Sequence, residues 1–437
     1  MQQKEAQPRL IQAMRDAFSL PDLRQRLLFT LGILVAFRFL VHVPLPGVDP
    51  QALSDFFEQN ALLGMLDLFS GGAMKNFSIA AMGVYPYITS SIIMQLLVPV
   101  IPSLQAISQQ GESGQRRINQ ITHFLAVPLA ALQGYSQLAI LTSQNVITRP
   151  DGITTATILI SMTAGTMFLV WLGELITERG IGNGISIIIF GGIVASLAES
   201  IGRISLAFQE NIFGTIAFGV LGAATLVFIV IFIEAHRRIP VQYARSTFRG
   251  GRMYRQSGST YIPLRVNTAG MIPLIFAIAM MQLPRIIASY FMNPQNPNFW
   301  DSMYQAFDPS AALPLGLLYW VLYFLLVFGF TFFYTMVIFE QMSLPKTLQQ
   351  QGGFIPGVRP GKSTSDYLNS VIRHLTFGGA TFLAFVAIMP FFARLITGVT
   401  VLTISSTAIL IAVGVALDTM KQLESQLTMR RYDGFLK

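Results

Sequence analysis

The chain contains no cysteine among its 437 residues, and only 11% of them are charged. The absence of cysteine excludes disulfides, thiolate metal sites and thiol nucleophiles. Ordinary soluble domains carry roughly 25% charged residues, whereas 52% of this chain is hydrophobic. These two properties together predict a polytopic membrane protein.

Groups that carry catalysis or ion coupling are also scarce. Carboxylates inside the membrane are typical of proton- or ion-coupled transporters. The acidic residues nearest to the apolar segments instead fall close to segment ends, and we interpret them as interfacial anchors: Glu174, Glu234, Glu340 and Asp418. The four histidines show no metal-ligand spacing, and the alternating glycines of 180–184 lack the strand and the Gly-Lys-Ser/Thr of a phosphate loop. We therefore expect no enzyme, no metal and no cofactor.

Apolar stretches of membrane-spanning length, about 20 residues each, recur along the chain. Hydrophobic pattern predicts ten helices, at residues 27–43, 78–101, 118–141, 154–177, 184–201, 214–235, 266–290, 315–339, 370–396 and 401–423. The first 26 residues are polar and the first apolar run is long enough to span, so no cleavable signal is expected.

Basic residues fix the predicted orientation, because Lys and Arg concentrate in cytosolic connections. With the N-terminus inside, the inner segments hold 23 of the 29 basic residues and the outer segments hold five. The remaining one, Arg38, lies near the outer end of the first helix, where it can snorkel. Both termini are therefore expected in the cytosol.

A short repeat indicates how the helices are organised. Residues 83–88 and 270–275 share the spacing Gly-x-x-Pro-x-Ile, and they lie five predicted helices apart. Because five is odd, two related halves would have opposite orientations in the membrane, as in inverted-repeat folds. Each proline is expected to kink its helix. Chance similarity is the alternative, since Gly and Pro are frequent in membrane helices.

The segment at 60–78 is apolar but too short to span. Residues 62–69 can be buried, and Ser70-Gly71-Gly72 follows as a hinge-like break. A half-length apolar helix is typical of a re-entrant segment, which needs protein or a water-filled cavity around it. A helix lying on the outer membrane surface is an equally good interpretation.

Seven arginines and no acidic residue lie between His236 and Arg265. Arginine binds phosphate and carboxylate groups through paired N–H donors, so RNA or an acidic protein surface is the expected partner. Anionic lipid headgroups are the alternative. A second large inner segment, 341–369, is less basic and is shaped by three prolines and four glycines.

Three blocks of sequence are long enough to identify a family: Leu68–Ala73 with Gly83–Leu97, Gly173–Phe190, and Phe354–Gly361. They resemble SecY, the channel-forming subunit family of the bacterial Sec protein translocase, and the resemblance covers nearly the whole chain. It implies an all-α polytopic membrane protein with ten transmembrane helices in two inverted, pseudosymmetric five-helix halves. It also implies a channel that passes unfolded polypeptides across the membrane and releases signal and transmembrane helices into lipid through a lateral gate.

The same resemblance implies a division of the chain. The parts are a cytosolic tail at 1–26, an N-terminal half at 27–201 that includes a plug at 62–72, a C-terminal half at 202–423 with cytosolic loops 236–265 and 341–369, and a cytosolic tail at 424–437. The expected location is the bacterial plasma membrane, with a plastid relative as the alternative.

The resemblance also assigns roles to residues. An apolar pore ring would comprise Val84, Ile88, Ile185, Ile189, Ile275 and Ile411, although Ser405-Ser406-Thr407 stands near the last where the family usually shows Gly-Gly-Thr. The plug would comprise Leu62, Leu63, Gly64, Met65, Leu66, Asp67, Leu68, Phe69, Ser70, Gly71 and Gly72. The lateral gate would include Pro86, Ser90, Gln95, Asn267, Thr268 and Pro273. Docking of a motor or ribosome would involve Arg245, Arg249, Arg252, Arg255 and Arg359.

Two polar residues are expected at the gate itself. Gln95 and Asn267 would hydrogen-bond across its closed seam, at only about 1 kcal/mol per bond in a membrane. Local backbone bonding or contact with water in the cytosolic funnel is the alternative.

The implied partners are SecE-like and SecG-like small membrane subunits, the SecA motor ATPase, the ribosome, secretory and membrane-protein substrates, and anionic lipid. Two other classes are weighed against the channel. An inverted-repeat secondary transporter would need polar substrate ligands at mid-membrane, and an intramembrane enzyme would need a buried catalytic or metal constellation. The sequence shows neither.

Overall fold

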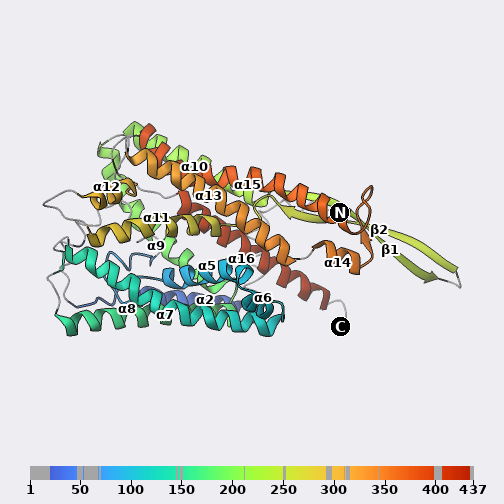
Figure 1. Cartoon of the computed structure of the whole chain (residues 1–437), viewed down its shortest axis with the longest axis horizontal. Helices are drawn as coiled ribbons and strands as arrows, with labels where there is room; N and C mark the ends of the chain where they lie inside the picture. The colour runs from blue at the N-terminus through green and yellow to red at the C-terminus, as the bar shows by residue number, and fades with distance from the viewer. Residues whose placement is uncertain are drawn as a thin grey trace. The chain divides into compact units, whose positions relative to one another are not determined.

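The computed structural model describes residues 20–46, 53, 67, 70–143, 146–147, 151–210, 212–249, 252–291, 298–309, 311, 315–342, 344–397 and 406–433 (Figure 1). The chain divides into two compact units, each described by itself. Unit 1 comprises Met1–Ile212, Pro284–Gly316 and Val399–Lys437, and unit 2 comprises Phe213–Leu283 and Leu317–Gly398.

Each of the ten predicted spans overlaps a described helix. They are α2 (Pro21–Val41), α5 (Tyr85–Val100), α7 (Glu112–Ser143), α8 (Gly152–Arg179), α9 (Gly184–Glu210), α10 (Ile212–Glu234), α11 (Ile272–Phe291), α13 (Leu315–Met342), α15 (Lys362–Thr397) and α16 (Ser406–Asp433). Shorter helices lie in the connections: α6 (Pro102–Ser108), α12 (Phe299–Ala306) and α14 (Leu344–Gln350).

Within the described part of the chain, five helices are long and apolar enough to cross a membrane: α7, α8, α10, α13 and α15. The pair α5 and α6 would make a sixth, but the chain bends by 102° between them. The apolar stretches of α9 and α11 are shorter, and α2 and α16 carry more charge. The helical content supports a multi-pass membrane protein, with spans of unequal length and polarity.

The arginine-rich segment between α10 and α11 is a β-ribbon, which the sequence analysis did not anticipate. Strands β1 (His236–Arg249) and β2 (Arg252–Arg265) pair antiparallel over their full length. Strand β3 (Gly353–Phe354), from the segment between α13 and α15, pairs with β1 and gives the order β2-β1-β3. Figure 1 shows the ribbon extending away from the helices of unit 2. The two predicted loops thus form one sheet.

Alternation of side chains explains the base of this ribbon. Ile239 and Val241 are buried, while Pro240 between them is exposed, as expected for a strand with one covered face. The buried pair packs with Leu348 of α14 and Leu368 of α15. A local apolar core therefore fixes the root of the sheet in unit 2.

Helices α8 and α9 approach each other closely at Gly173 and Gly184. A Cβ on Gly184 would lie 1.8 Å from the carbonyl oxygen of Gly173, and a Cβ on Gly173 would lie 2.9 Å from Ile185. The Gly184 N–H also donates to Thr177 Oγ1 at 2.9 Å. Because no side chain fits there, helix packing accounts for glycine at positions 173 and 184.

In unit 1, an apolar core forms where residues 73–82 meet α7 and α8. Phe77 and Met82 pack there with Ala130, Ile158 and Met162, all of them buried. This core holds the connection between the predicted plug and α5 in a defined place, which matters for the site below.

Candidate functional site

The two Gly-x-x-Pro-x-Ile segments have the same local structure. Gly83 and Gly270 have positive φ, +54° and +65°, and α5 and α11 each begin two residues later. Pro86 and Pro273 are the second residues of these helices, where proline is tolerated because the first turn leaves its N–H groups unpaired. The prediction that these prolines kink their helices is wrong. They help to start helices that begin later than the predicted residues 78 and 266.

Five of the six predicted pore-ring residues lie in unit 1, and Ile275 lies in unit 2. Val84 caps α5 and is 2% exposed, and the N–H of Ile88 donates to its carbonyl oxygen at 3.1 Å. Ile189 of α9 and Ile411 of α16 are buried. Ile185 and Ile189 of α9 and Ile411 of α16 come from two helices that pack together, whereas Val84 and Ile88 belong to α5, which packs against α7 and α8.

The predicted plug is described at four residues: Asp67, Ser70, Gly71 and Gly72. Residues 62–66, 68 and 69 lie outside the described residues. Ser70 Oγ donates to the Asp67 carbonyl oxygen at 3.0 Å and accepts from the Met74 N–H at 3.1 Å. The carboxylate of Asp67 accepts from the Lys75 N–H at 2.9 Å. The predicted hinge-like break is thus a turn fixed by side-chain hydrogen bonds.

Arg38 fastens this turn to the first helix. Its Nη1 donates to the carbonyl oxygen of Gly71 at 2.6 Å, so the guanidinium faces protein where snorkelling was expected. A Cβ on Gly71 would lie 2.7 Å from the Cα of Gly192 in α9 and 3.2 Å from the ring of Phe37. The turn therefore sits tightly between α2 and α9. Sequence reasoning missed this contact because its partners lie far apart in the chain.

Several predicted gate residues are tied down locally. Ser90 of α5 is fully buried, and its hydroxyl donates to the carbonyl oxygen of Thr122 in α7. Thr268 Oγ1 donates to the Arg265 carbonyl oxygen at 2.9 Å. The first bond joins α5 to α7 and the second lies within the segment before α11, so neither bond joins α5 to α11.

Gln95 and Asn267 are two of seven described residues that have a buried side-chain polar atom without a hydrogen-bond partner. Gln95 Nε2 donates to Ser91 Oγ at 3.3 Å, which is a local side-chain bond. The Oε1 of Gln95 and the Oδ1 of Asn267, however, are buried and have no hydrogen-bond partner in the part of the chain that the structure describes. A buried oxygen without a donor costs about 1–3 kcal/mol, so both positions favour a state in which a donor reaches them.

The predicted docking arginines of the first inner segment lie on the ribbon. Arg245 and Arg249 belong to β1, and Arg252 and Arg255 belong to β2. The register places Arg249 directly opposite Arg252 at the end of the ribbon.

Arg359 follows a Pro-Gly turn. The Val358 N–H donates to the Ile355 carbonyl oxygen at 3.1 Å, and Gly357 has φ +84°, which is the geometry of a type II turn. Ile355 is buried in the core beneath the sheet, whereas Arg359 is exposed. Its carbonyl oxygen accepts from Thr364 Oγ1 at 2.8 Å. The guanidinium therefore stands on the same rigid base as the ribbon.

A histidine–carboxylate contact was not expected. Glu174 Oε1 of α8 lies 3.0 Å from His123 Nε2 of α7, with 47% and 24% of the two side chains exposed. Tyr87 of α5 packs edge-on against the His123 ring, with centroids 5.1 Å apart. Glu174 was predicted to be an interfacial anchor, and the structure in addition pairs it with His123. No spacing in the sequence could indicate this contact, because its three residues come from three different helices.

Comparisons with known proteins agree with this architecture. A family model described as SecY matches residues 78–420. The protein translocase subunit SecY of Streptomyces scabiei is 40% identical over 447 aligned positions, which cover 98% of this chain and 100% of that protein.

Two solved structures have the same fold. One is a SecY channel whose plug domain stabilises the closed state and maintains a membrane seal, with a TM-score of 0.63 and 16% identity. The other is Sec61 in a canine ribosome–channel complex from the endoplasmic reticulum, also with a TM-score of 0.63 and 16% identity. In both cases 97% of each chain is covered. With its ten-helix fold and a full-length relative at 40% identity, this chain belongs to the SecY family.

Proposed function

We propose that this chain is the protein-conducting channel of a Sec translocon in a bacterial plasma membrane, with both termini in the cytosol. The full-length identity to a translocase subunit carries this proposal. The rival interpretation as a secondary transporter has no support from the relatives reported above, which are translocase or channel proteins. Unfolded polypeptides would cross the pore, and signal or transmembrane helices would leave sideways into lipid.

The apolar character of the ring residues suits this task. The proposed ring comprises Val84, Ile88, Ile185, Ile189, Ile275 and Ile411. A narrow apolar constriction resists ion leakage by dewetting, and it offers no charged group that would bind one particular side chain of a passing polypeptide. The plug turn at Ser70–Gly72, closely packed in unit 1, would add a second seal on the outer side.

The gate is proposed to lie between α5 and α11. Gln95 and Asn267 each have a buried oxygen that lacks a donor in the described residues, and each stands on one of these two helices or just before it. Opening of a seam between them would let water or a polar substrate segment reach both oxygens.

A disulfide across the proposed gate tests the function. The chain has no cysteine, so Gln95→Cys and Asn267→Cys can be combined in an otherwise unreactive background. Oxidation of the double variant in reconstituted vesicles should stop export of a signal-bearing substrate, and reduction should restore it. Each single-cysteine variant, oxidised in the same way, serves as the matched control.

Two results would count against the proposal. If the crosslinked double variant exported at the normal rate, polypeptides would not need these helices to part. If no disulfide formed under oxidising conditions, the two positions would not face each other, and the gate would have to be assigned elsewhere on α5 and α11.

The three-stranded sheet of unit 2 is proposed as the docking surface for the SecA motor or the translating ribosome. Its support is the joining of the arginine ribbon and the Arg359 turn on one rigid base. The similar Sec61 structure is in complex with a ribosome, and its phosphate-rich RNA suits arginine recognition. SecE-like and SecG-like subunits and anionic lipid complete the proposed set of partners.

Charge reversal separates the two parts of this surface. Arg359→Glu should reduce motor-driven export by about one to two orders of magnitude, because a charge-assisted contact contributes about 1.5–3 kcal/mol. Protein level and resting conductance should not change, since the side chain is exposed. If Arg359→Glu exports normally while reversals at Arg245, Arg249 and Arg255 do not, docking uses the ribbon without the turn.

A further inference from the structure

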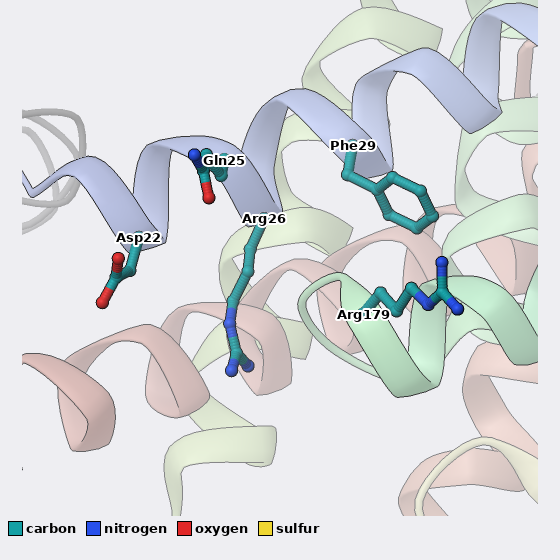
Figure 2. Close-up of a pocket in the computed structure, with 5 residues that line it drawn as sticks. All are labelled: Asp22, Gln25, Arg26, Phe29 and Arg179. Atoms are coloured by element: carbon teal, nitrogen blue, oxygen red, sulfur yellow. The ribbon is translucent and has the colours of Figure 1, made fainter.

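Arginines in unit 1 are held in very different ways. Arg26 and Arg179 line an open pocket where α2 begins and α8 ends. Both side chains are exposed, and Figure 2 shows their guanidinium groups pointing away from each other. Arg285 of α11, in contrast, has only 7% of its side chain exposed. Burial of a charged group is costly unless its partners are well placed, so the contacts of Arg285 indicate a specific structural task.

Arg285 joins the C-terminal part of α11 to the connection that follows it. Its Nη2 donates to the Tyr304 hydroxyl at 2.9 Å and lies 3.4 Å from the carboxylate of Asp308. Its guanidinium carbon also lies 4.6 Å from the centroid of the Tyr304 ring. Tyr304 belongs to α12, and Asp308 follows that helix. Removal of one partner from a buried ion pair is strongly destabilising, so these contacts should keep α12 attached to α11.

The side of α11 away from Arg285 carries an exposed apolar surface. Ile287 and Phe291, four residues apart and so on one face, are 47% and 56% exposed. Phe299, the first residue of α12, is 74% exposed. The Trp300 ring packs against both phenylalanines, with centroid distances of 4.9 Å to Phe291 and 5.8 Å to Phe299. The exposed face of α11 therefore continues through Trp300 onto α12.

The sequence of α12 separates apolar from polar side chains. Phe299 and Met303 share one face of the helix, whereas Asp301 and Gln305 share the opposite face. The Asn298 N–H donates to the Asp301 carboxylate at 2.7 Å, which fixes the start of the helix. Helices with this separation lie along a membrane surface, with the apolar face in lipid and the polar face in water.

The chain around α12 has the composition of an outer connection. No Lys or Arg occurs between Arg285 and Lys346, as the positive-inside rule requires of a segment outside the cytosol. In sequence, α12 lies between the apolar helices α11 and α13. Trp and Tyr are enriched at the depth of the lipid headgroups, and α12 carries one of each. The assignment to the outer side rests on the orientation proposed above.

We propose that α12 lies in the outer headgroup region of the bilayer, with Phe291, Phe299 and Trp300 in contact with lipid. Arg285 is the positioning residue that holds α12 against α11. A phospholipid interface suits this surface because it gives the aromatic rings apolar contact while the polar face of α12 stays in water. Since α11 is one side of the proposed gate, the attachment would keep the outer end of that helix at a constant depth.

Spin labels in the cysteine-free chain test this placement. Phe299→Cys and Gln305→Cys put the label on opposite faces of α12, so each variant is the matched control of the other. The labelled full-length chain is reconstituted in vesicles of phosphatidylethanolamine and phosphatidylglycerol. Collisions of the label with oxygen, which concentrates in lipid, are compared with collisions with a neutral nickel chelate, which stays in water. The ratio of oxygen to nickel collisions should be severalfold higher at position 299 than at position 305.

Two other outcomes would overturn the proposal. Equal ratios at the two positions, or more nickel collisions at position 299, would mean that α12 lies in water outside the membrane. Protection of position 299 from both reagents would mean that protein covers this face, whether from the same chain or from a second copy.

Tyr304→Phe tests the attachment to Arg285 without leaving a buried charge alone. It removes the hydroxyl that accepts from Arg285 and keeps the ring beside the guanidinium. Combined with Gln305→Cys, it should raise the mobility of the spin label and reduce the difference between positions 299 and 305. Arg285→Met should have the same effect to a greater degree, and Tyr304→Phe decides the question if Arg285→Met does not fold.

Ser302→Ala is the matched control for the attachment, because Ser302 is an exposed residue of α12 that should not affect the contacts of Arg285. Its label should behave as in the parent chain. A label unchanged by Tyr304→Phe, or changed equally by Ser302→Ala, would show that Arg285 does not hold α12. None of these readouts uses export or depends on which side faces the cytosol. Failure of the gate crosslink would therefore affect the channel proposal alone.

Discussion

Gly71 in unit 1 and Gly270 in unit 2 have nearly the same φ angle, but Gly71 is closely packed and Gly270 has open space around it. Their φ values are +70° and +65°, a region in which residues with a Cβ are strained. A Cβ on Gly71 would lie 2.7 Å from the backbone of Gly192, whereas none of the described atoms would lie within 4 Å of a Cβ on Gly270. The positive φ angle alone explains why position 270 is glycine. At position 71, the positive φ angle and the close packing both require glycine.

The difference matches the roles proposed for the two places. The turn at Gly71 ends the proposed plug and is held by Arg38 and by packing on α9, as a seal requires. The turn at Gly270 starts α11, one side of the proposed gate, and has open space around it. A part that must move benefits from having few close contacts.

The strongest way to test the seal is to remove it. Deletion of residues 62–72 takes away the proposed plug together with the Gly71 acceptor of Arg38. Resting ion conductance of reconstituted vesicles should rise by about tenfold or more, because a sealed apolar path becomes open to water. Export should continue, with looser signal requirements. An unchanged leak would instead place this segment on the membrane surface.

Gly71→Ala tests the tight packing directly. Left-handed strain and a clash with the Gly192 backbone should together reduce the free energy of unfolding by about 2–4 kcal/mol. Thermal unfolding of the purified chain measures this loss, and conductance shows whether the seal is displaced. A loss no greater than that of Gly270→Ala would show that α9 yields easily, and the contrast between the two turns would disappear.

Arg38→Met isolates the other attachment of the same turn. Methionine keeps the apolar length of the side chain but leaves the Gly71 carbonyl oxygen without this donor, which should cost about 1.5–3 kcal/mol. Arg38→Lys restores a charged donor and should recover part of the loss. The readouts are thermal unfolding and resting conductance. If methionine and lysine behave alike, the 2.6 Å contact contributes little to holding the turn.

The sequence predicted the helical elements well because long apolar runs are a strong local signal. Each of the ten predicted spans overlaps a helix, and the Pro-Gly turn before Arg359 forms as its residues require. The β-ribbon at 236–265 was missed because apolar and polar residues alternate over only a short part of it. Ile239 and Val241 are buried, but the rest of the segment is rich in arginine.

The contacts that build the site could not be predicted in the same way. Arg38 meets Gly71 across 33 positions of sequence, and Glu174 meets His123 from another helix. Each depends on how helices pack, and no local pattern encodes that. The proline of each Gly-x-x-Pro segment was placed in a helix interior for a related reason. Hydropathy continues through the turn, so it does not show that the helix starts two residues after the glycine.

Gly270→Ala should have the smallest effect of the series. Left-handed strain costs about 1–2 kcal/mol, while alanine lowers the entropy of the unfolded chain and offsets about 0.4–1 kcal/mol of this. The net loss of unfolding free energy should be about 1 kcal/mol or less, with export and resting conductance close to wild type. A loss as large as that of Gly71→Ala would show that the start of α11 is closely packed in the membrane, where a partner subunit or lipid fills the space around it.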